Sequence, residues 1–239
     1  MKAIFNKEIQ SFFSNPVGYL LVISFLLLNG LILWVFKGSS NVFYSGFADI
    51  NAFFSNSSWI LAVLIPAMTM KSFADEYNNG TIEILKTLPV SHTHIVLAKF
   101  WAFMVVIFIT LTPSLVFVYS TYQLGNPIGN IDLGSTLTSY FGLALLASTY
   151  IGIGLFSSIV MLNNVSAFIL STIINFTLYF GFTAIENVSE ITSSGWGNFG
   201  ITPHFEGMTR GVIDSTDLIY FISLTLAFLV WTKIKLDHV

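Results

Sequence analysis

Reactive side chains are few in this sequence, and they form no catalytic pattern. The 239 residues include nine Lys and Arg, twelve Asp and Glu, four His and no Cys. Thiol nucleophiles and Cys-ligated zinc are therefore excluded, and neither a His-Glu-x-x-His motif nor a Gly-x-Ser-x-Gly turn occurs. The phosphate-binding Gly-x-x-x-x-Gly-Lys loop is also missing. We therefore predict no catalytic residue, no metal ligand and no cofactor on this chain, so that any ATP and Mg would bind to a partner.

The largest group of charged side chains falls in one segment, residues 71–99, which reads KSFADEYNNGTIEILKTLPVSHTHIVLAK. The Asn-Asn-Gly sequence that ends at Gly80 predicts a turn. Thr81 follows it and is placed to cap a short helix over residues 81–88. Pro89 would end this helix, because proline has no amide hydrogen to donate.

The short helix predicted after the turn has an apolar side and a charged side. Ile82, Leu85 and Leu88 recur at helical spacing and form an apolar stripe. Glu83 lies in the first turn, where its charge is favourable for the helix dipole, and Lys86 follows one turn later. We expect this amphipathic helix to lie beneath the membrane, with its stripe either in an apolar groove of a partner or on lipid headgroups.

The remainder of the chain is strongly apolar, with 54% hydrophobic and 9% charged residues. Soluble domains carry about 25% charged residues, and a net charge of −3 offers no basic field for nucleic acid. Charge-free runs of about 20 residues suit helices that cross a membrane, and they are apolar on every side, unlike barrel strands. The sequence predicts an all-α integral membrane protein with six transmembrane helices, at residues 16–36, 56–74, 97–120, 135–161, 165–185 and 217–234.

Two further expectations come from the same runs. The adjacent amides Asn163 and Asn164 interrupt the longest run and predict the turn between the fourth and fifth spans. The runs themselves hold no charged residue, which argues against an ion relay within the spans. Sodium coupling through broken helices and backbone carbonyls stays open.

The distribution of Lys and Arg predicts the orientation in the membrane. With the N-terminus in the cytoplasm, seven of the nine lie on that side, and only Lys37 and Arg210 lie outside. We therefore expect a multi-pass protein of the cytoplasmic (inner) membrane with both termini in the cytoplasm. Residues 75–96 then form the main cytoplasmic loop, and residues 186–216 form an outer segment.

Residues 1–14 predict a second amphipathic helix ahead of the first span. Phe5, Ile9, Phe12 and Phe13 share its apolar face. The opposite face carries the polar residues Asn6, Lys7, Gln10, Ser11 and Ser14. Such a helix lies in the membrane interface, either as a simple anchor or as a contact for a partner.

Small and polar residues within the spans have structural interpretations. Gly154 and Ser158 form a small-residue row, which we expect to serve packing within the chain rather than a dimer interface. Asn175 is expected to bond to a neighbouring helix. His204 has no second ligand residue beside it, so we assign it to the surface and assign no metal.

Residues 76–100, EYNNGTIEILKTLPVSHTHIVLAKF, resemble the E-x-x-x-G-T-x-E-x-L-x-x-x-P-x-S-x-x-x-x-x-x-K signature of ABC-2-type transporter permeases. The residues in register are Glu76, Gly80, Thr81, Glu83, Leu85, Pro89, Ser91 and Lys99. The resemblance implies a half-transporter with the type V exporter-like permease fold. Such a chain pairs with a second copy or a paralogous permease, and ABC ATPase subunits bind its cytoplasmic face.

The family resemblance also implies roles for the two amphipathic helices. The 81–88 helix would be the coupling helix and residues 1–14 the connecting helix, both seated in the ATPase. The coupling residues would be Glu76, Gly80, Thr81, Ile82, Glu83, Leu85, Lys86, Leu88 and Pro89; those of the connecting helix would be Phe5, Ile9, Phe12 and Phe13. Residues 186–216 would form short re-entrant helices at the outer mouth.

Residues 202–221, TPHFEGMTRGVIDSTDLIYF, resemble the segment before the last span in gliding-motility-associated and copper-maturation ABC permeases. The likeness is greatest to the gliding-motility permeases, which implies export in support of motility. The alternative function is a membrane anchor or assembly scaffold of a motility or secretion complex, without transport.

Overall fold

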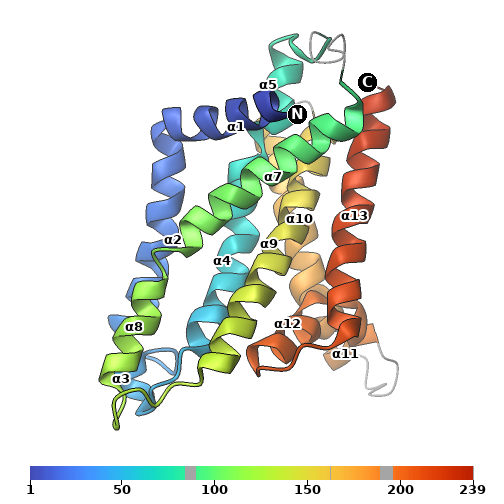
Figure 1. Ribbon diagram of the computed structural model, residues 1–239. Coiled ribbons are helices and arrows are strands. Elements are labelled where there is room, and N and C mark those ends of the chain that lie inside the picture. Colours follow the sequence, from blue (N-terminus) through green and yellow to red (C-terminus); the bar gives the residue numbers. More distant parts are fainter. Residues whose placement is uncertain (84–89, 162, 189–195, 239) are drawn as a thin grey trace.

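The computed structural model describes residues 1–83, 90–161, 163–188 and 196–238. In these ranges every regular element is a helix (Figure 1). The helices are α1 (Lys2–Ser14), α2 (Pro16–Trp34), α3 (Val42–Ser45), α4 (Asn51–Thr69), α5 (Lys71–Asn78), α7 (His92–Leu111), α8 (Leu115–Leu124), α9 (Leu133–Val160), α10 (Asn164–Phe176), η1 (Thr177–Gly181), α11 (Phe182–Val188), η2 (Trp196–Phe199), α12 (Ile201–Thr209) and α13 (Ser215–His238).

Six helical stretches in the described ranges are long and apolar enough to cross a membrane, which confirms the predicted number. They are Pro16–Trp34, Asn51–Asn78, His92–Leu124, Leu133–Val160, Asn164–Glu186 and Ser215–His238. The two ends of the chain lie at the same end of the bundle (Figure 1). We call this the terminal end, and the end that holds α3, α11 and α12 the opposite end.

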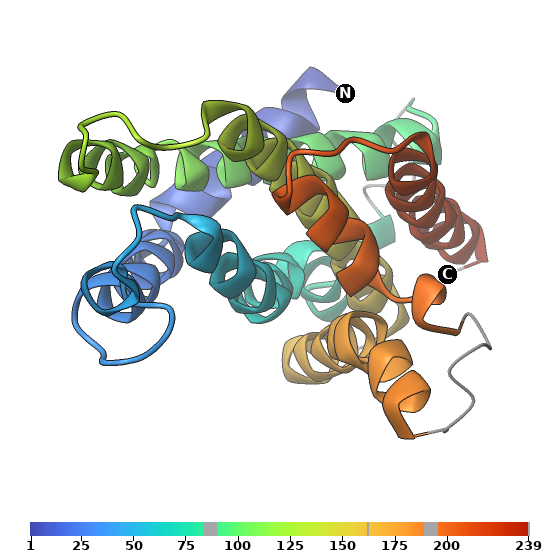
Figure 2. The same cartoon turned by 90° about the horizontal axis from the view of Figure 1, so that it is seen from below.

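Helix α9 is the centre of the bundle. Seen along the bundle, α4, α10, α12 and α13 surround it (Figure 2). In its most apolar stretch 78% of the residues are buried, against 22% in α2 and 17% in the stretch that begins with α10. Helices α2 and α10 therefore leave much more of their apolar surface uncovered than α9 does.

Helix α1 lies across the terminal end and turns sharply into α2 (Figure 1). The Asn15 side chain accepts a hydrogen bond from the Val17 amide at 3.1 Å, and Pro16 opens α2 without needing a partner for its nitrogen. A Cβ at Gly18 would lie 2.3 Å from the Phe12 carbonyl oxygen. The corner is therefore closed so tightly that residue 18 must be glycine.

The second span consists of two helices, α4 and α5, which meet at Met70. Ser158 on α9 accepts hydrogen bonds from the amides of Phe73 and Ala74, at 2.9 and 3.1 Å. Its hydroxyl donates to the Met70 carbonyl at 2.8 Å. Ser158 therefore satisfies backbone groups on both sides of the junction.

The contacts of Gly154 confirm that the small-residue row serves packing within the chain. A Cβ at Gly154 would lie 2.0 Å from the Thr69 hydroxyl oxygen, at the end of α4. Asn175 also bonds within the chain as expected, because its side-chain amide donates to the Ala62 carbonyl at 3.0 Å.

The third span starts earlier than its predicted bounds, because α7 begins at His92, five residues before residue 97. Pro113 lies at the break between α7 and α8, where proline cannot donate an amide hydrogen bond. Lys99 lies within α7, where it is fully buried. The expectation that the spans hold no charged residue is therefore wrong: besides Lys99 in α7, Glu76 and Asp217 are buried within the stretches Asn51–Asn78 and Ser215–His238.

The fifth span contains a π-helix, η1, between α10 and α11. Beyond it, η2 and α12 pack at the opposite end, and residues 189–195 of the predicted outer segment lie outside the described ranges. His204 on α12 is not the free surface residue that we expected. Its Nδ1 lies 2.6 Å from Asp217 Oδ1 on α13, and its Nε2 lies 2.8 Å from the Asn198 carbonyl oxygen.

Candidate functional site

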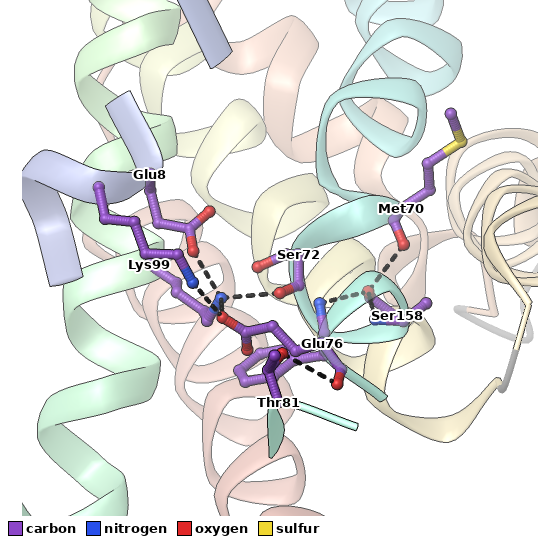
Figure 3. A network of polar contacts seen from close by, with 10 residues as sticks. Glu8, Met70, Ser72, Glu76, Thr81, Lys99 and Ser158 are labelled. Atoms are coloured by element: carbon purple, nitrogen blue, oxygen red, sulfur yellow. Dashed lines mark hydrogen bonds and ion pairs between the residues drawn. The ribbon is translucent and has the colours of Figure 1, made fainter. Parts of the chain in front are cut away.

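The side chain of Lys99 is the most unusual feature of the terminal end, because it carries a charge and is fully buried in α7. Its Nζ donates to Glu8 Oε1 at 2.6 Å and to the Ser72 carbonyl at 2.7 Å, and it lies 3.2 Å from Glu76 Oε1 (Figure 3). The ammonium is also 4.7 Å from the centre of the Phe73 ring. A buried ammonium is stable only with such partners, and here each of its three protons has an acceptor nearby.

Glu76 also pairs with a second lysine. The Lys7 Nζ donates to Glu76 Oε1 at 2.9 Å, so that this oxygen serves both Lys7 and Lys99. We call Lys7, Glu8, Glu76 and Lys99 the four-charge cluster. Its two positive and two negative groups balance, which lowers the cost of keeping them out of water.

The two lysines of the cluster have different surroundings. Burial opposes the charged form of Lys7, but the hydrogen bond to Glu76 and the negative charges of Glu76 and Glu8 outweigh it and raise the Lys7 pKa. The Lys7 side chain is 60% exposed, whereas that of Lys99 is not exposed at all. Water screens the Lys7 pair, so the contacts of Lys99 dominate the energy of the cluster.

The four-charge cluster joins three helices that are far apart in sequence. Lys7 and Glu8 belong to α1, Glu76 to α5 and Lys99 to α7. Helix α5 leads into the segment of the predicted coupling helix, and α7 leads out of it. The surface helix is therefore tied by ion pairs to both sides of that segment.

Glu76 also closes the end of α5 through its backbone. Its carbonyl accepts from the Thr81 amide at 2.9 Å and from the Thr81 hydroxyl at 3.2 Å, while the Gly80 amide donates to the Tyr77 carbonyl. Gly80 has φ +66°, the left-handed conformation that this helix ending requires. Three signature residues, Glu76, Gly80 and Thr81, thus fix the direction in which the chain leaves α5.

The structure describes only the first part of the predicted coupling helix. Four of the assigned residues lie outside the described ranges: Leu85, Lys86, Leu88 and Pro89. Glu83 is exposed, as a contact residue should be. Ile82 differs from the expectation, because it is 6% exposed and packs in the core of the chain. In this conformation Ile82 anchors the segment and does not offer its side chain to a partner.

The predicted apolar face of α1 packs against the chain itself. Phe5, Phe12 and Phe13 are half-buried against the core, and Ile9 is also half-buried. The sequence interpretation missed Glu8 and placed Lys7 on a face without contacts. The spacing along the helix could have indicated that Glu8 faces inward. Glu8 lies four residues after the buried Ile4 and four before Phe12, so the three residues share one face of α1.

No group of three or more His, Asp or Glu residues within the described part of the chain is placed to hold a metal ion. Six apolar spans and a surface helix held by buried ion pairs define a multi-pass helical membrane protein. The sequence pattern of the ABC-2 family transporter proteins matches residues 2–196, and the chain belongs to this family. No curated protein matches the chain.

Members of the ABC-2 family are membrane permease components of ABC transporters, and membership implies association with an ABC ATPase. The matched range contains the whole four-charge cluster and both helices next to the coupling segment. It ends before α12 and α13, so the segment that resembles the gliding-motility permeases lies beyond it.

Proposed function

We propose that this chain couples ATP hydrolysis by a partner ATPase to the export of a substrate across the cytoplasmic membrane. The observation that carries the proposal is the four-charge cluster, which ties α1 to both helices beside the coupling segment. A force applied to this segment would reach α1, α5 and α7 together, because moving one of them alone would leave a buried charge unpaired.

The terminal end offers short routes from this cluster to the spans. Helix α1 continues into α2 through the closed corner at Gly18, and α5 continues into α4 through the junction at Met70. Ser158 connects that junction to the central helix α9. In the proposed mechanism, closure of the ATPase subunits around ATP moves these helices as a unit and changes which side of the membrane the pathway faces.

The proposed partner surface consists of α1 and the exposed part of the coupling segment. Glu83 is its described charged contact, and the sequence assigns Leu85, Lys86 and Leu88, which lie outside the described residues, to the same surface. ATP and Mg would bind to the ATPase subunits. This assignment places the terminal end in the cytoplasm, in agreement with the excess of lysine there.

The proposed complete transporter contains two permease chains, either two copies of this one or this chain with a paralogue. The exposed apolar faces of α2 and α10 leave room for such a partner as well as for membrane lipid. A role in gliding motility is supported by the sequence resemblance of residues 202–221, and it remains part of the proposal.

The test is purification of the chain from its native membrane in mild detergent, followed by identification of copurifying proteins and measurement of ATP hydrolysis. We expect an ATPase with nucleotide-binding motifs. The Glu83→Lys variant should insert into the membrane normally, but its rate of coupled ATP hydrolysis should be at least tenfold lower. Glu206→Lys, an exposed charge reversal at the opposite end, is the matched control and should retain activity.

Two results would contradict the proposal. The absence of any nucleotide-binding partner would favour the scaffold alternative. Full coupled hydrolysis in the Glu83→Lys variant would leave the partnership intact but remove the coupling assignment.

A further inference from the structure

A cavity of about 400 Å³ lies beside the four-charge cluster, between α1, the start of α2 and the α4–α5 junction. Its wall changes character from one side to the other. Helices α1 and α5 contribute charged and polar residues, among them Lys7 and Lys71, whereas α2, α4 and α7 contribute Leu21, Met68 and Phe103. The cavity is therefore amphiphilic, with its polar part toward the terminal end.

The position of the cavity matches the boundary between lipid headgroups and hydrocarbon. Helix α1 lies across the end of the bundle (Figure 1). The residues that line the cavity come from the corner where this surface helix meets the first span. Amphipathic surface helices lie at headgroup depth, and the spans beneath them face acyl chains.

The charged groups around the cavity are unequally satisfied. Glu8 and Glu76 accept hydrogen bonds from the lysines of the four-charge cluster, and Asp75 accepts one from the Asn164 side chain at 2.6 Å. Lys71 is exposed and pairs with no residue in the described ranges. Among the described lining residues, the groups still available to a ligand include the Lys71 ammonium, which favours an anionic group such as a phosphate, and Glu76 Oε2, which is buried without a hydrogen-bond partner and can accept from a headgroup hydroxyl.

We propose that this cavity binds a membrane phospholipid, with its phosphodiester between Lys7 and Lys71 and an acyl chain along Leu21 and Met68. A free inorganic anion would leave the apolar wall uncovered, and a plain hydrocarbon would leave Lys71 without a partner. The volume lies within the range of about 300–1,000 Å³ that is common for ligand sites. It accommodates the headgroup and the first part of one chain, and the remainder extends into the bilayer.

A lipid at this site would touch both α1 and α5 next to the four-charge cluster. It would fill the space under the surface helix and hold α1 against the second span. The site goes beyond the proposed coupling function, and its test does not involve the ATPase.

The experiment is native mass spectrometry of the full-length chain in mild detergent, titrated with palmitoyl-oleoyl phosphatidylglycerol. Dioleoylglycerol, which has the tails but no phosphate, and inorganic phosphate are the comparison ligands. Lys71→Gln tests the headgroup contact, and Lys235→Gln, another exposed lysine of the terminal end, is the matched control. Ala67→Phe tests the apolar part, because Ala67 lines the cavity and a phenyl group would fill it.

We expect Lys71→Gln to weaken phosphatidylglycerol binding about fivefold, the change that corresponds to about 1 kcal/mol for one lysine near an anionic lipid. Ala67→Phe should weaken it at least as much, while Lys235→Gln leaves it unchanged. Equal binding of phosphatidylglycerol to all four proteins would overturn the proposal. So would dioleoylglycerol binding as tightly as the phospholipid, or inorganic phosphate displacing the phospholipid at equal concentration.

Discussion

The two ends of the bundle hold their short helices by different means. At the terminal end, Lys99 is completely buried and binds two carboxylates that come from two other helices. At the opposite end, α12 is held to α13 by His204 and Asp217, whose side chains are 16% and 12% exposed, and by stacking of His204 on Tyr220.

This difference indicates which end moves as a unit. Separating α1, α5 and α7 would leave buried charges unpaired, at a cost of several kcal/mol. Separating α12 from α13 would break the contact between His204 and Asp217, in which neither side chain is completely buried. We therefore expect the terminal end to transmit force as one body and the opposite end to open more easily.

The largest effect should come from Lys99→Met, which removes the buried cation that Glu8 and Glu76 share and leaves Glu76 with its contact to the more exposed Lys7. We expect the free energy of unfolding to fall by about 3–5 kcal/mol, and protease cleavage between α1 and α2 to increase. Thermal unfolding and limited proteolysis in detergent measure the two effects. Substitution of an exposed lysine, Lys235→Met, is the control. Equal stability of the two variants would contradict the proposal that buried ion pairs hold the terminal end together.

A smaller effect is expected from Ser158→Ala, which removes the hydroxyl group that serves the α4–α5 junction. The free energy of unfolding should fall by about 1–3 kcal/mol, because backbone groups of Met70, Phe73 and Ala74 lose their partner. Hydrogen exchange of the α5 amides should rise. Ser148→Ala, on the same helix α9, is the matched control. The Ser148 hydroxyl bonds to Leu145 and Thr225 and not to the α4–α5 junction. A change in α5 exchange with Ser148→Ala as well would show that the effect is not specific to the junction.

At the opposite end, His204→Gln should lower the local stability by about 1–2 kcal/mol, through loss of the contacts to Asp217 and Asn198. Faster hydrogen exchange should be confined to η2 and α12, and coupled ATP hydrolysis should stay normal. Loss of hydrolysis comparable to that of Glu83→Lys would show that the two ends are not separable in this way.

The smallest effect is expected from alanine substitutions at two similar glycines, one at each end of the bundle. Gly80 at the terminal end and Gly46 at the opposite end have φ values of +66° and +72°, and a Cβ at either would meet no atom within 4 Å. Alanine at each should therefore cost the same, roughly 1 kcal/mol. Only Gly80→Ala should also reduce coupled hydrolysis, because it alters the exit from α5. Equal activity of the two variants would argue against a role for this exit.

The parts of the fold that the sequence predicts well depend on local signals. Long apolar runs mark the spans, Asn15 and Pro16 mark the start of α2, and Asn163 caps α10 after the interruption that we expected between two spans. The helix ending at Gly80 is local as well, because the Asn-Asn-Gly sequence already requires a residue with positive φ.

The four-charge cluster could not be predicted in the same way. In the sequence, Lys99 is one of the basic residues that predict the orientation, and counting charges does not show which helix turns a charge inward. The burial of Ile82 likewise results from packing against other helices, which its spacing to Leu85 does not reveal. The π-helix η1 adds one residue to a turn, a shift that apolar periodicity does not detect.

The pairing of Glu8 with Lys99 also constrains how the protein is made. The two residues are 91 positions apart, so when α1 and the first span leave the ribosome, the cation that will neutralise Glu8 has not yet been synthesised. During that interval the contacts of α1 with α5 and α7 are missing, and we expect its apolar face to hold it at the membrane surface. Its final position is set only when the third span enters the bilayer, and the surface helix that begins the chain is therefore among the later elements to be fixed.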